Sequence, residues 1–233
     1  MSAIVKICGL STAPTLDAAL AAGADVVGFV FFAKSPRHLS LDDARALARR
    51  VGGRARIAVL TVDASDEALR AIVAAVAPDD LQLHGAETPA RVAELKGMFG
   101  LSTIKAIGVS AAGDLARAGA YAKVADLLLF DAKAPRDARH PGGNGVAFDW
   151  RLLAGLDLAE PWLLSGGLDP DNVAEAIAVT GARGVDVSSG VESAPGVKDI
   201  DKIEAFIAQA RAAFARAAAI PSARPELQPG RIA

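Results

Sequence analysis

Short apolar runs recur along the chain, separated by segments with a helical pattern of apolar and polar positions. The runs cover residues 5–10, 25–31, 57–62, 80–84, 102–107, 127–131, 162–165 and 184–188. Runs of this length that are apolar at nearly every position are typical of parallel strands buried on both faces. The pattern therefore predicts eight strands.

The segments between these runs carry helix-start and helix-stop signals. Ser11 precedes a predicted helix to Ala22, and Gly23 supplies a left-handed stop. Further helices are expected from Ser40 to Val51, after Ser65, from Thr88, from Asp169-Pro170 and over residues 198–218. Alternation of eight strands with helices predicts an α/β fold, a closed (β/α)8 TIM barrel, with an open doubly wound sheet as the alternative.

One barrel domain is expected over residues 1–218, followed by a disordered tail over 219–233. Prolines at 221, 225 and 229 prevent the last helix from continuing through that tail. The longest connection, residues 131–147, contains two prolines and Gly142-Gly143, and loops of this length are typically lids or disordered segments.

Composition narrows the classes of function. The 233 residues are 52% hydrophobic, which suffices for a large core, and the net charge of −2 without a basic cluster argues against a nucleic-acid partner. A single cysteine excludes an internal disulfide, and three separated histidines give no metal-ligand spacing, so no metal site is expected. Without a signal peptide or a long apolar span, we expect a cytoplasmic protein with no membrane partner, either a monomer or a homodimer.

Several polar side chains stand where predicted strands end, which is where barrel enzymes keep their chemistry. They are Cys8, His84, Asp131 and Asp186. A lone cysteine is commonly a small buried hydrophobe, and His84 either contacts a substrate or hydrogen-bonds a loop carbonyl. Arg37 lies in the loop after the second strand, above the strand end.

Two lysines interrupt apolar strands and need a counter-charge. Lys6 shares a strand face with Cys8, and Lys105 lies within the fifth strand. We expect Asp131 and Asp186 to neutralise both lysines inside the barrel, because an unpaired buried charge is costly. Lys6 could also favour the thiolate of Cys8, whereas a purely structural ion network stays open as the alternative.

Small residues follow the seventh and eighth strands. Gly166-Gly167 and Ser189-Gly190 would expose backbone N–H groups at the strand ends, where barrel enzymes bind phosphate. Gly166, Gly167, Ser189 and Gly190 are therefore predicted to bind a phosphate group.

Seven motifs in register resemble the phosphoribosylanthranilate isomerase family of tryptophan biosynthesis. They are Lys6-Ile7-Cys8-Gly9, Gly23-Ala24-Asp25 with Gly28-Phe29, Lys34-Ser35-Pro36-Arg37, Gln82-Leu83-His84-Gly85, Asp131 with Gly142-Gly143-Asn144-Gly145 and Phe148-Asp149-Trp150, Leu164-Ser165-Gly166-Gly167-Leu168, and Asp186-Val187-Ser188-Ser189-Gly190-Val191-Glu192. The chain departs from the family pattern at Asp63, where an asparagine is usual.

The resemblance implies a TIM barrel that needs no cofactor and no metal. It implies an Amadori rearrangement of N-(5-phosphoribosyl)anthranilate to 1-(2-carboxyphenylamino)-1-deoxyribulose 5-phosphate, with Asp131 as general acid and Cys8 as general base. Arg37 would hold the anthranilate carboxylate, and His84 and Asp186 would contact the substrate.

Three other interpretations stay open. A sugar-phosphate isomerase of the histidine-pathway type would use two aspartates, so Cys8 argues against it. For an indole-glycerol phosphate synthase, this sequence shows no supporting pattern of lysine and glutamate. A non-catalytic phosphosugar-binding barrel would need the phosphate site without the pair Cys8 and Asp131.

Overall fold

The computed structural model describes residues 3–133, 142, 148–156, 158 and 161–219. Within these residues, eight parallel strands close into a barrel in chain order, each paired with its neighbours and β8 paired with β1. The strands are β1 (Ile4–Cys8), β2 (Val26–Phe31), β3 (Arg56–Thr61), β4 (Asp80–Leu83), β5 (Ser102–Val109), β6 (Leu127–Ala132), β7 (Trp162–Leu164) and β8 (Gly184–Val187). The predicted (β/α)8 barrel is confirmed.

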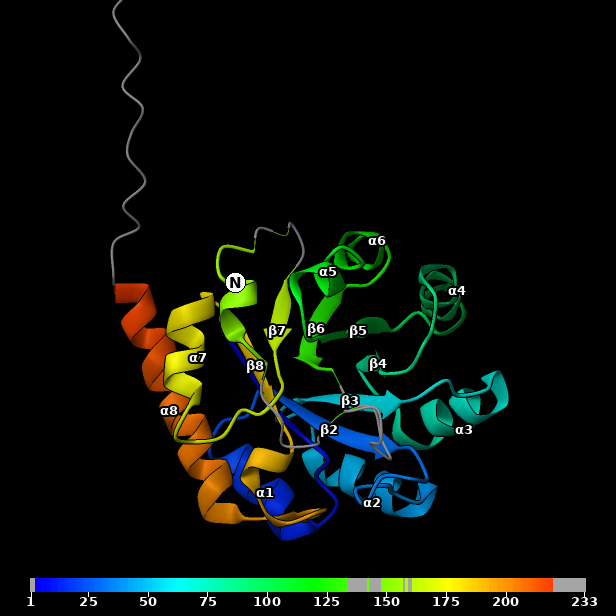
Figure 1. The fold of residues 1–233 in the computed structure, drawn as a ribbon. Helices are drawn as coiled ribbons and strands as arrows, with labels where there is room; N and C mark the ends of the chain where they lie inside the picture. Colours follow the sequence, from blue (N-terminus) through cyan, green and yellow to red (C-terminus); the bar gives the residue numbers. More distant parts are fainter. Residues whose placement is uncertain (1–2, 134–141, 143–147, 157, 159–160, 220–233) are drawn as a thin grey trace, which may run out of the picture.

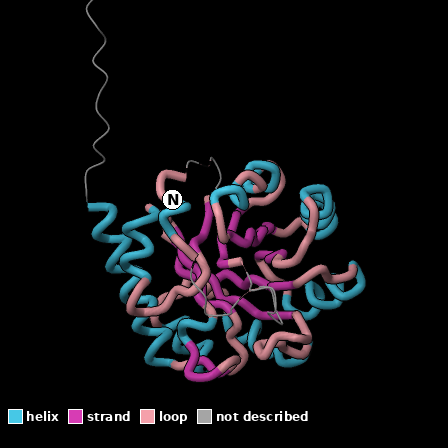
Figure 2. The backbone as a smooth tube through the Cα atoms, viewed as in Figure 1, coloured by secondary structure: helices cyan, strands magenta, loops and turns pink. Residues whose placement is uncertain are grey.

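Helices surround the strands, which occupy the centre of the molecule (Figures 1 and 2). The helices are α1 (Ala13–Ala21), α2 (Leu41–Val51), α3 (Asp66–Val76), α4 (Pro89–Phe99), α5 (Ala112–Leu115), α6 (Ala118–Ala122), α7 (Val173–Thr180) and α8 (Ile200–Ala219). Short 3-10 helices η1 (Trp150–Leu153) and η2 (Ser189–Val191) and a small hairpin of β9 (Glu192–Ala194) and β10 (Val197–Lys198) complete the described elements.

Helix starts follow the predicted capping chemistry in three places. The hydroxyl groups of Ser40, Ser65 and Thr88 accept hydrogen bonds from backbone amides of the first turns of α2, α3 and α4. Gly52 adopts the left-handed conformation at the end of α2 (φ 58°), as a glycine stop requires.

Two predicted helix starts were wrong. Helix α1 begins at Ala13, with Thr12 rather than Ser11 at the N-cap. Helix α7 begins at Val173 rather than at Pro170, because the Asp169 side chain accepts hydrogen bonds from the amides of Asp171 and Asn172 and holds these residues in a turn.

Buried apolar side chains form two layers. The larger layer lies between the strands and the helices and includes Val5, Ile7 and Phe29. The smaller layer fills the barrel interior with Val26, Ala58, Ile104, Ala106, Leu129 and Leu163. Because strand side chains alternate, residues in step with the smaller layer point into the barrel and the others point towards the helices.

Helix α8 extends through Ala219, one residue past the predicted end of the domain. The predicted tail otherwise falls on residues 220–233, and the predicted lid falls largely on 134–141 and 143–147; both segments lie outside the described residues. Among the residues that the structure does describe, no helix combines the length and the hydrophobicity needed to cross a membrane.

Candidate active site

Cys8 is the last residue of β1 and lies at the rim of the barrel where all the parallel strands end. Its side chain is in step with Lys6 and points inward, and the residue is 3% exposed. Gly28 of β2 makes room for the thiol, since a methyl group there would come 2.9 Å from the Cys8 Sγ. The absence of a side chain at this position of β2 therefore leaves space for the sulfur atom.

A buried ion pair lies one step deeper in the barrel than Cys8. The Lys6 Nζ is 2.6 Å from the Asp186 Oδ1, and the Ser165 hydroxyl donates to the Asp186 Oδ2 at 3.2 Å. The prediction that Asp186 neutralises Lys6 is confirmed. Asp186 is held by protein groups on both carboxylate oxygens, and its predicted contact with substrate stays a prediction.

Burial governs the protonation of Cys8. Loss of hydration has the largest effect and raises the pKa of the Cys8 thiol. The Lys6 ammonium and, to a smaller extent, Lys198 lower this pKa, whereas Asp186 raises it. The net result is a pKa above the ordinary value for cysteine. Burial is the largest single effect on the Lys6 ammonium and lowers its pKa, but Asp186 and Cys8 together outweigh burial and leave the pKa of Lys6 above its ordinary value. The expected help from Lys6 is therefore present but smaller than the effect of burial.

Asp131 lies near the end of β6 and contacts His84, which follows β4 directly. The His84 Nε2 is 3.3 Å from the Asp131 Oδ2, and the Gln82 Nε2 is 3.2 Å from the His84 Nδ1. If the Gln82 amide donates to Nδ1, the proton of a neutral His84 is on Nε2, the nitrogen that contacts Asp131. In the described structure the histidine thus contacts the candidate acid, not a loop carbonyl.

Gly142, from the long connection after β6, lies against this pair. A methyl group on Gly142 would come 2.6 Å from the His84 Nε2 and 2.7 Å from the Asp131 Oδ2. Gly166, after β7, approaches the other carboxylate oxygen, because a methyl group there would come 3.1 Å from the Asp131 Oδ1. Glycines from two connections therefore pack closely around the carboxylate.

The two glycine-containing loops of the predicted phosphate site are in contact. Gly166 and Gly167 both have positive φ angles, 86° and 69°, which favour glycine. A methyl group on Gly190 would overlap the Leu168 carbonyl oxygen, so the loops after β7 and β8 approach more closely than any side chain permits. Ser189 and Gly190 lie in η2. These residues meet at one place on the rim, and phosphate binding by them stays a prediction.

Arg37 is buried and forms a two-pronged ion pair with Glu192. Its Nε and Nη2 donate to the Glu192 Oε1 and Oε2 at 2.6 and 2.8 Å. The Lys198 Nζ is 2.8 Å from the Glu192 Oε1 and also donates to the Ser188 carbonyl at 2.7 Å. The arginine side chain passes close to Gly9, where a methyl group would come 2.6 Å from the Arg37 Cδ. Arg37 is thus fixed beside the strand end that carries Cys8.

Burial opposes ionisation of Glu192, but the hydrogen bonds from Arg37 and the charge of Lys198 outweigh it and lower the pKa of this carboxyl. A carboxylate between two cations is the stable arrangement. Sequence reasoning missed the roles of Glu192 and Lys198. Glu192 stands at the end of a family motif, which was a usable signal, whereas nothing in the sequence around Lys198 distinguishes it.

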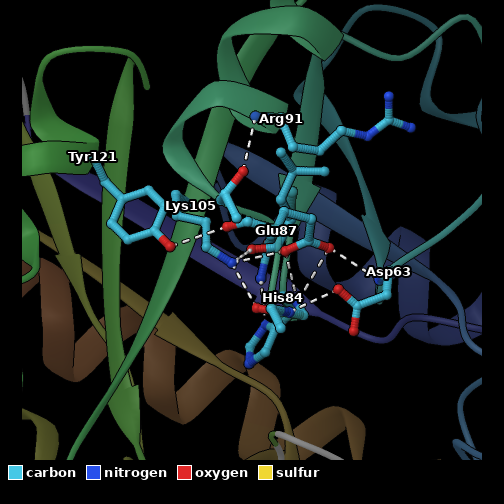
Figure 3. Close-up of polar contacts among 11 residues, drawn as sticks. Asp63, His84, Glu87, Arg91, Lys105 and Tyr121 are labelled. Carbon is cyan, nitrogen blue, oxygen red and sulfur yellow. Dashed lines mark hydrogen bonds and ion pairs between the residues drawn. The ribbon is translucent and has the colours of Figure 1, made fainter.

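Lys105 is not inside the barrel, and the prediction that Asp131 or Asp186 neutralises it was wrong. Its neighbours Ile104 and Ala106 belong to the interior layer, so Lys105 points towards the helices. Its Nζ is 2.7 Å from the Glu87 Oε2 (Figure 3). The alternation of side chains along the strand predicted which residues share a face of β5, but not which of the two faces points into the barrel.

The Asp63 position, where the family usually has asparagine, is compatible with the fold. Asp63 has a φ of 47°, a conformation that asparagine and aspartate adopt more readily than other residues. Its Oδ1 accepts a hydrogen bond from the Ala86 amide at 2.7 Å, so either residue could link the loops after β3 and β4 in this way.

The sequence matches the family model of N-(5'-phosphoribosyl)anthranilate isomerase over residues 5–209. The chain belongs to this family. A relative from Rhodopseudomonas palustris (strain BisB5) with the name of this isomerase is 61% identical over 212 residues, which are 91% of this chain and 97% of the relative. A relative of the same name from Bradyrhizobium diazoefficiens is 59% identical over 212 residues, 91% of this chain and 95% of that protein.

Solved structures of this isomerase have the same fold. The Thermotoga maritima enzyme superimposes with a TM-score of 0.79 at 37% identity, covering 91% of this chain and 100% of that one. A second structure, with a TM-score of 0.77 at 35% identity and the same coverage, holds reduced 1-(o-carboxyphenylamino)-1-deoxyribulose 5-phosphate.

As a phosphoribosylanthranilate isomerase, the chain is an enzyme of tryptophan biosynthesis that rearranges N-(5-phosphoribosyl)anthranilate. The interpretations as a histidine-pathway isomerase, an indole-glycerol phosphate synthase or a non-catalytic barrel are set aside by this family membership.

Proposed function

We propose that Asp131 is the general acid and Cys8 the general base of the isomerase reaction. The observation that carries this assignment is the position of both side chains: each is the last inward-pointing residue of its strand, β6 or β1, on the same rim of the barrel. A sugar bound over the barrel mouth would lie between a proton donor and a proton acceptor.

In the proposed reaction, the protonated Asp131 carboxyl gives its proton to the furanose ring oxygen. The bond between that oxygen and C1′ breaks, and the ring opens to a Schiff base. Cys8 then removes the proton from C2′, and the electron pair of that C–H bond forms the enolamine, which tautomerises to the aminoketose. Each general acid or base step of this kind contributes about 10²–10⁴-fold.

The base step needs the thiolate, although burial holds Cys8 as the thiol in the free enzyme. Lys6 and Lys198 are the cations that favour the thiolate, and Asp186 is the carboxylate that opposes it. The form of Cys8 that can act as a base is therefore a minor protonation state of the free enzyme.

Substrate binding is assigned to the rest of the rim. Arg37 would hold the anthranilate carboxylate, with Glu192 fixing the orientation of the guanidinium group. Gly166, Gly167, Ser189 and Gly190 would hold the phosphate through backbone amides. His84 and Asp186 would contact the sugar between these two ends. If Arg37→Ala left the KM unchanged, the carboxylate assignment would fail.

The acid and base roles are tested by turnover of Cys8→Ser and Asp131→Asn, followed through the fluorescence loss of the substrate. We expect kcat to fall by at least about 10²-fold in each variant, with unchanged circular dichroism. Asp17→Asn, which removes an exposed carboxylate that pairs with Arg50, is the control and should keep full activity. Near-normal turnover of either site variant would remove that residue from its role.

Two further expectations concern the chain as a whole. The Thermotoga maritima enzyme has been described as dimeric, with monomers generated from it. For this chain, a monomer or a homodimer is distinguished by sedimentation equilibrium. Every proposed site residue precedes Ala219. Removal of residues 220–233 should therefore change kcat and KM by no more than about twofold, and a twofold change in KM corresponds to less than about 0.5 kcal/mol of binding free energy.

A further inference from the structure

Lys105 is buried outside the barrel interior, between β5 and the segment that leads from β4 to α4. It is 2% exposed, and its ammonium group lies 5.7 Å from the centre of the Tyr121 ring of α6. Figure 3 shows the lysine pointing into the turn formed by residues 83–87. A buried lysine in this position needs a structural or functional reason, because its desolvation is unfavourable.

The Lys105 Nζ holds the two backbone carbonyls that flank His84. It donates to the Leu83 oxygen at 3.2 Å and to the Gly85 oxygen at 2.7 Å, and its third partner is the Glu87 Oε2 at 2.7 Å. Three donors of one ammonium group are thereby used within five consecutive residues. Lys105 therefore holds the backbone on both sides of His84.

Glu87 completes the arrangement from the opposite direction. Its carboxylate accepts hydrogen bonds from the Gly85 amide at 3.0 Å and from the Asp63 amide at 3.0 Å, and the Tyr121 hydroxyl donates to its carbonyl at 3.0 Å (Figure 3). Groups from the loop after β3, from the middle of β5 and from α6 therefore converge on one turn. Such a turn has little freedom to shift.

The residue held in this way is the one that contacts the candidate acid. The distance from the His84 Nε2 to the Asp131 Oδ2 is 3.3 Å, slightly beyond the usual range for an N–H···O hydrogen bond. Because hydrogen bonds weaken steeply with distance and angle, a displacement of the turn well below 1 Å would remove this contact. Lys105 points towards the helices, and both it and Glu87 are buried with their charged groups paired to each other, so neither is exposed to a substrate at the barrel mouth.

We propose that Lys105 and Glu87 are positioning residues of the isomerase: they fix the turn after β4 so that His84 stays against the Asp131 carboxylate. This inference rests on the proposed role of Asp131 as the acid. Its consequence is that a charge pair on the helix-facing side of the sheet affects the chemical step without contacting substrate. A merely structural pair would affect stability and leave the turnover of folded enzyme unchanged.

The test is a double-mutant cycle on full-length enzyme with Lys105→Met and His84→Ala. We expect Lys105→Met alone to lower kcat by about tenfold to about 100-fold with KM within about twofold, since small misplacements remote from the chemistry have effects of this size. In the His84→Ala background, Lys105→Met should lower kcat no further. The matched control is Lys96→Met, which removes an exposed lysine of α4 that pairs with Asp126 and should leave kcat unchanged.

Two additional variants keep the test decisive if Lys105→Met does not fold. Tyr121→Phe removes only the hydroxyl contact with the Glu87 carbonyl and should lower kcat in the same direction by a smaller factor. Lys105→Arg keeps a buried cation and should recover part of the loss. An equal loss of kcat with and without His84, or a loss confined to KM, would overturn the proposal.

A readout without turnover separates this proposal from the assignment of the acid. The imidazole proton signals of His84 in NMR spectra, assigned with His84→Ala, should move in Lys105→Met and in Asp131→Asn but not in Lys96→Met. Unchanged His84 signals in Lys105→Met would overturn the positioning role. Normal turnover of Asp131→Asn would overturn the acid assignment, whatever the His84 signals do.

Discussion

The Lys6 Nζ lies 2.6 Å from the Asp186 Oδ1 inside the barrel, two residues before Cys8 on the same strand. The pair places a cation and a carboxylate next to the thiol, and their effects on the Cys8 pKa have opposite signs. Lys6 has the larger effect of the two. Together, Lys6 and Asp186 therefore favour the thiolate, but burial outweighs them and the pKa of Cys8 is raised.

Removal of Lys6 should raise the Cys8 pKa further. The thiolate absorbance at about 240 nm, taken as the difference between the enzyme and Cys8→Ala, reports Cys8, because the chain has one cysteine and the subtraction removes the tyrosine signal. We expect a midpoint above the ordinary thiol value in the native enzyme and a higher one in Lys6→Met. The double variant Lys6→Met/Asp186→Asn avoids an unpaired buried carboxylate and should also shift upwards. A midpoint unchanged in both variants would contradict this account, and Lys96→Met serves as the control.

The raised Cys8 pKa also predicts a loss of stability at alkaline pH. Between the pKa of the unfolded thiol, about 8.5, and the higher folded value, only the unfolded state has released this proton. The free energy of unfolding therefore decreases as pH rises through this window, by up to about 1.4 kcal/mol per pH unit, and the contribution is fully present below it.

Urea unfolding of the native enzyme and of Cys8→Ser at several pH values checks this prediction. The difference in unfolding free energy between the two proteins should be constant at neutral pH and should change in favour of Cys8→Ser above about pH 8.5. Parallel curves throughout the alkaline range would show that Cys8 does not titrate abnormally.

Lys198 should matter for substrate affinity through two contacts. Its Nζ holds Glu192, which orients Arg37, and the Ser188 carbonyl, which precedes the predicted phosphate loop. Since a hydrogen bond to a charged group contributes about 1.5–3 kcal/mol, Lys198→Met should raise KM by about tenfold to about 100-fold. Lys202→Met is the matched control, because this exposed lysine donates to the Glu192 carbonyl at 2.9 Å and reaches neither Arg37 nor Ser188. Equal KM values for the two variants would argue against the link.

Gly190→Ala should weaken phosphate binding. The added methyl group would overlap the Leu168 carbonyl oxygen, so the loops after β7 and β8 must separate. We expect an increase in KM of at least about tenfold, or about 1.4 kcal/mol, and weaker inhibition by inorganic phosphate. Gly97→Ala in α4 is the control: its added methyl group would meet no atom within 4 Å apart from its chain neighbours and the backbone of its own helix. Alanine in a helix should stabilise the fold by about 0.5–1 kcal/mol. Unchanged phosphate inhibition in Gly190→Ala would place the phosphate elsewhere.

The sequence by itself determined the order of helices and strands and which polar residues stand at the strand ends. Hydroxyl caps at Ser40, Ser65 and Thr88 and the apolar strand runs are local signals, and they predicted the barrel correctly. Strand parity also predicted that Lys6 and Cys8 share a face. These features depend on residues close together in the chain, so a local pattern is sufficient to fix them.

Only the tertiary structure decided which residues form ion pairs with Lys105 and Arg37 and in which direction the pKa of Cys8 is shifted. Lys105 pairs with Glu87 rather than with an aspartate of the interior, and Arg37 is joined to Glu192, 155 residues later in the chain. The Cys8 pKa is raised because burial outweighs Lys6. Partner choice depends on which distant segments meet, and desolvation depends on everything packed around a group. Neither quantity is encoded in the spacing of residues along one strand.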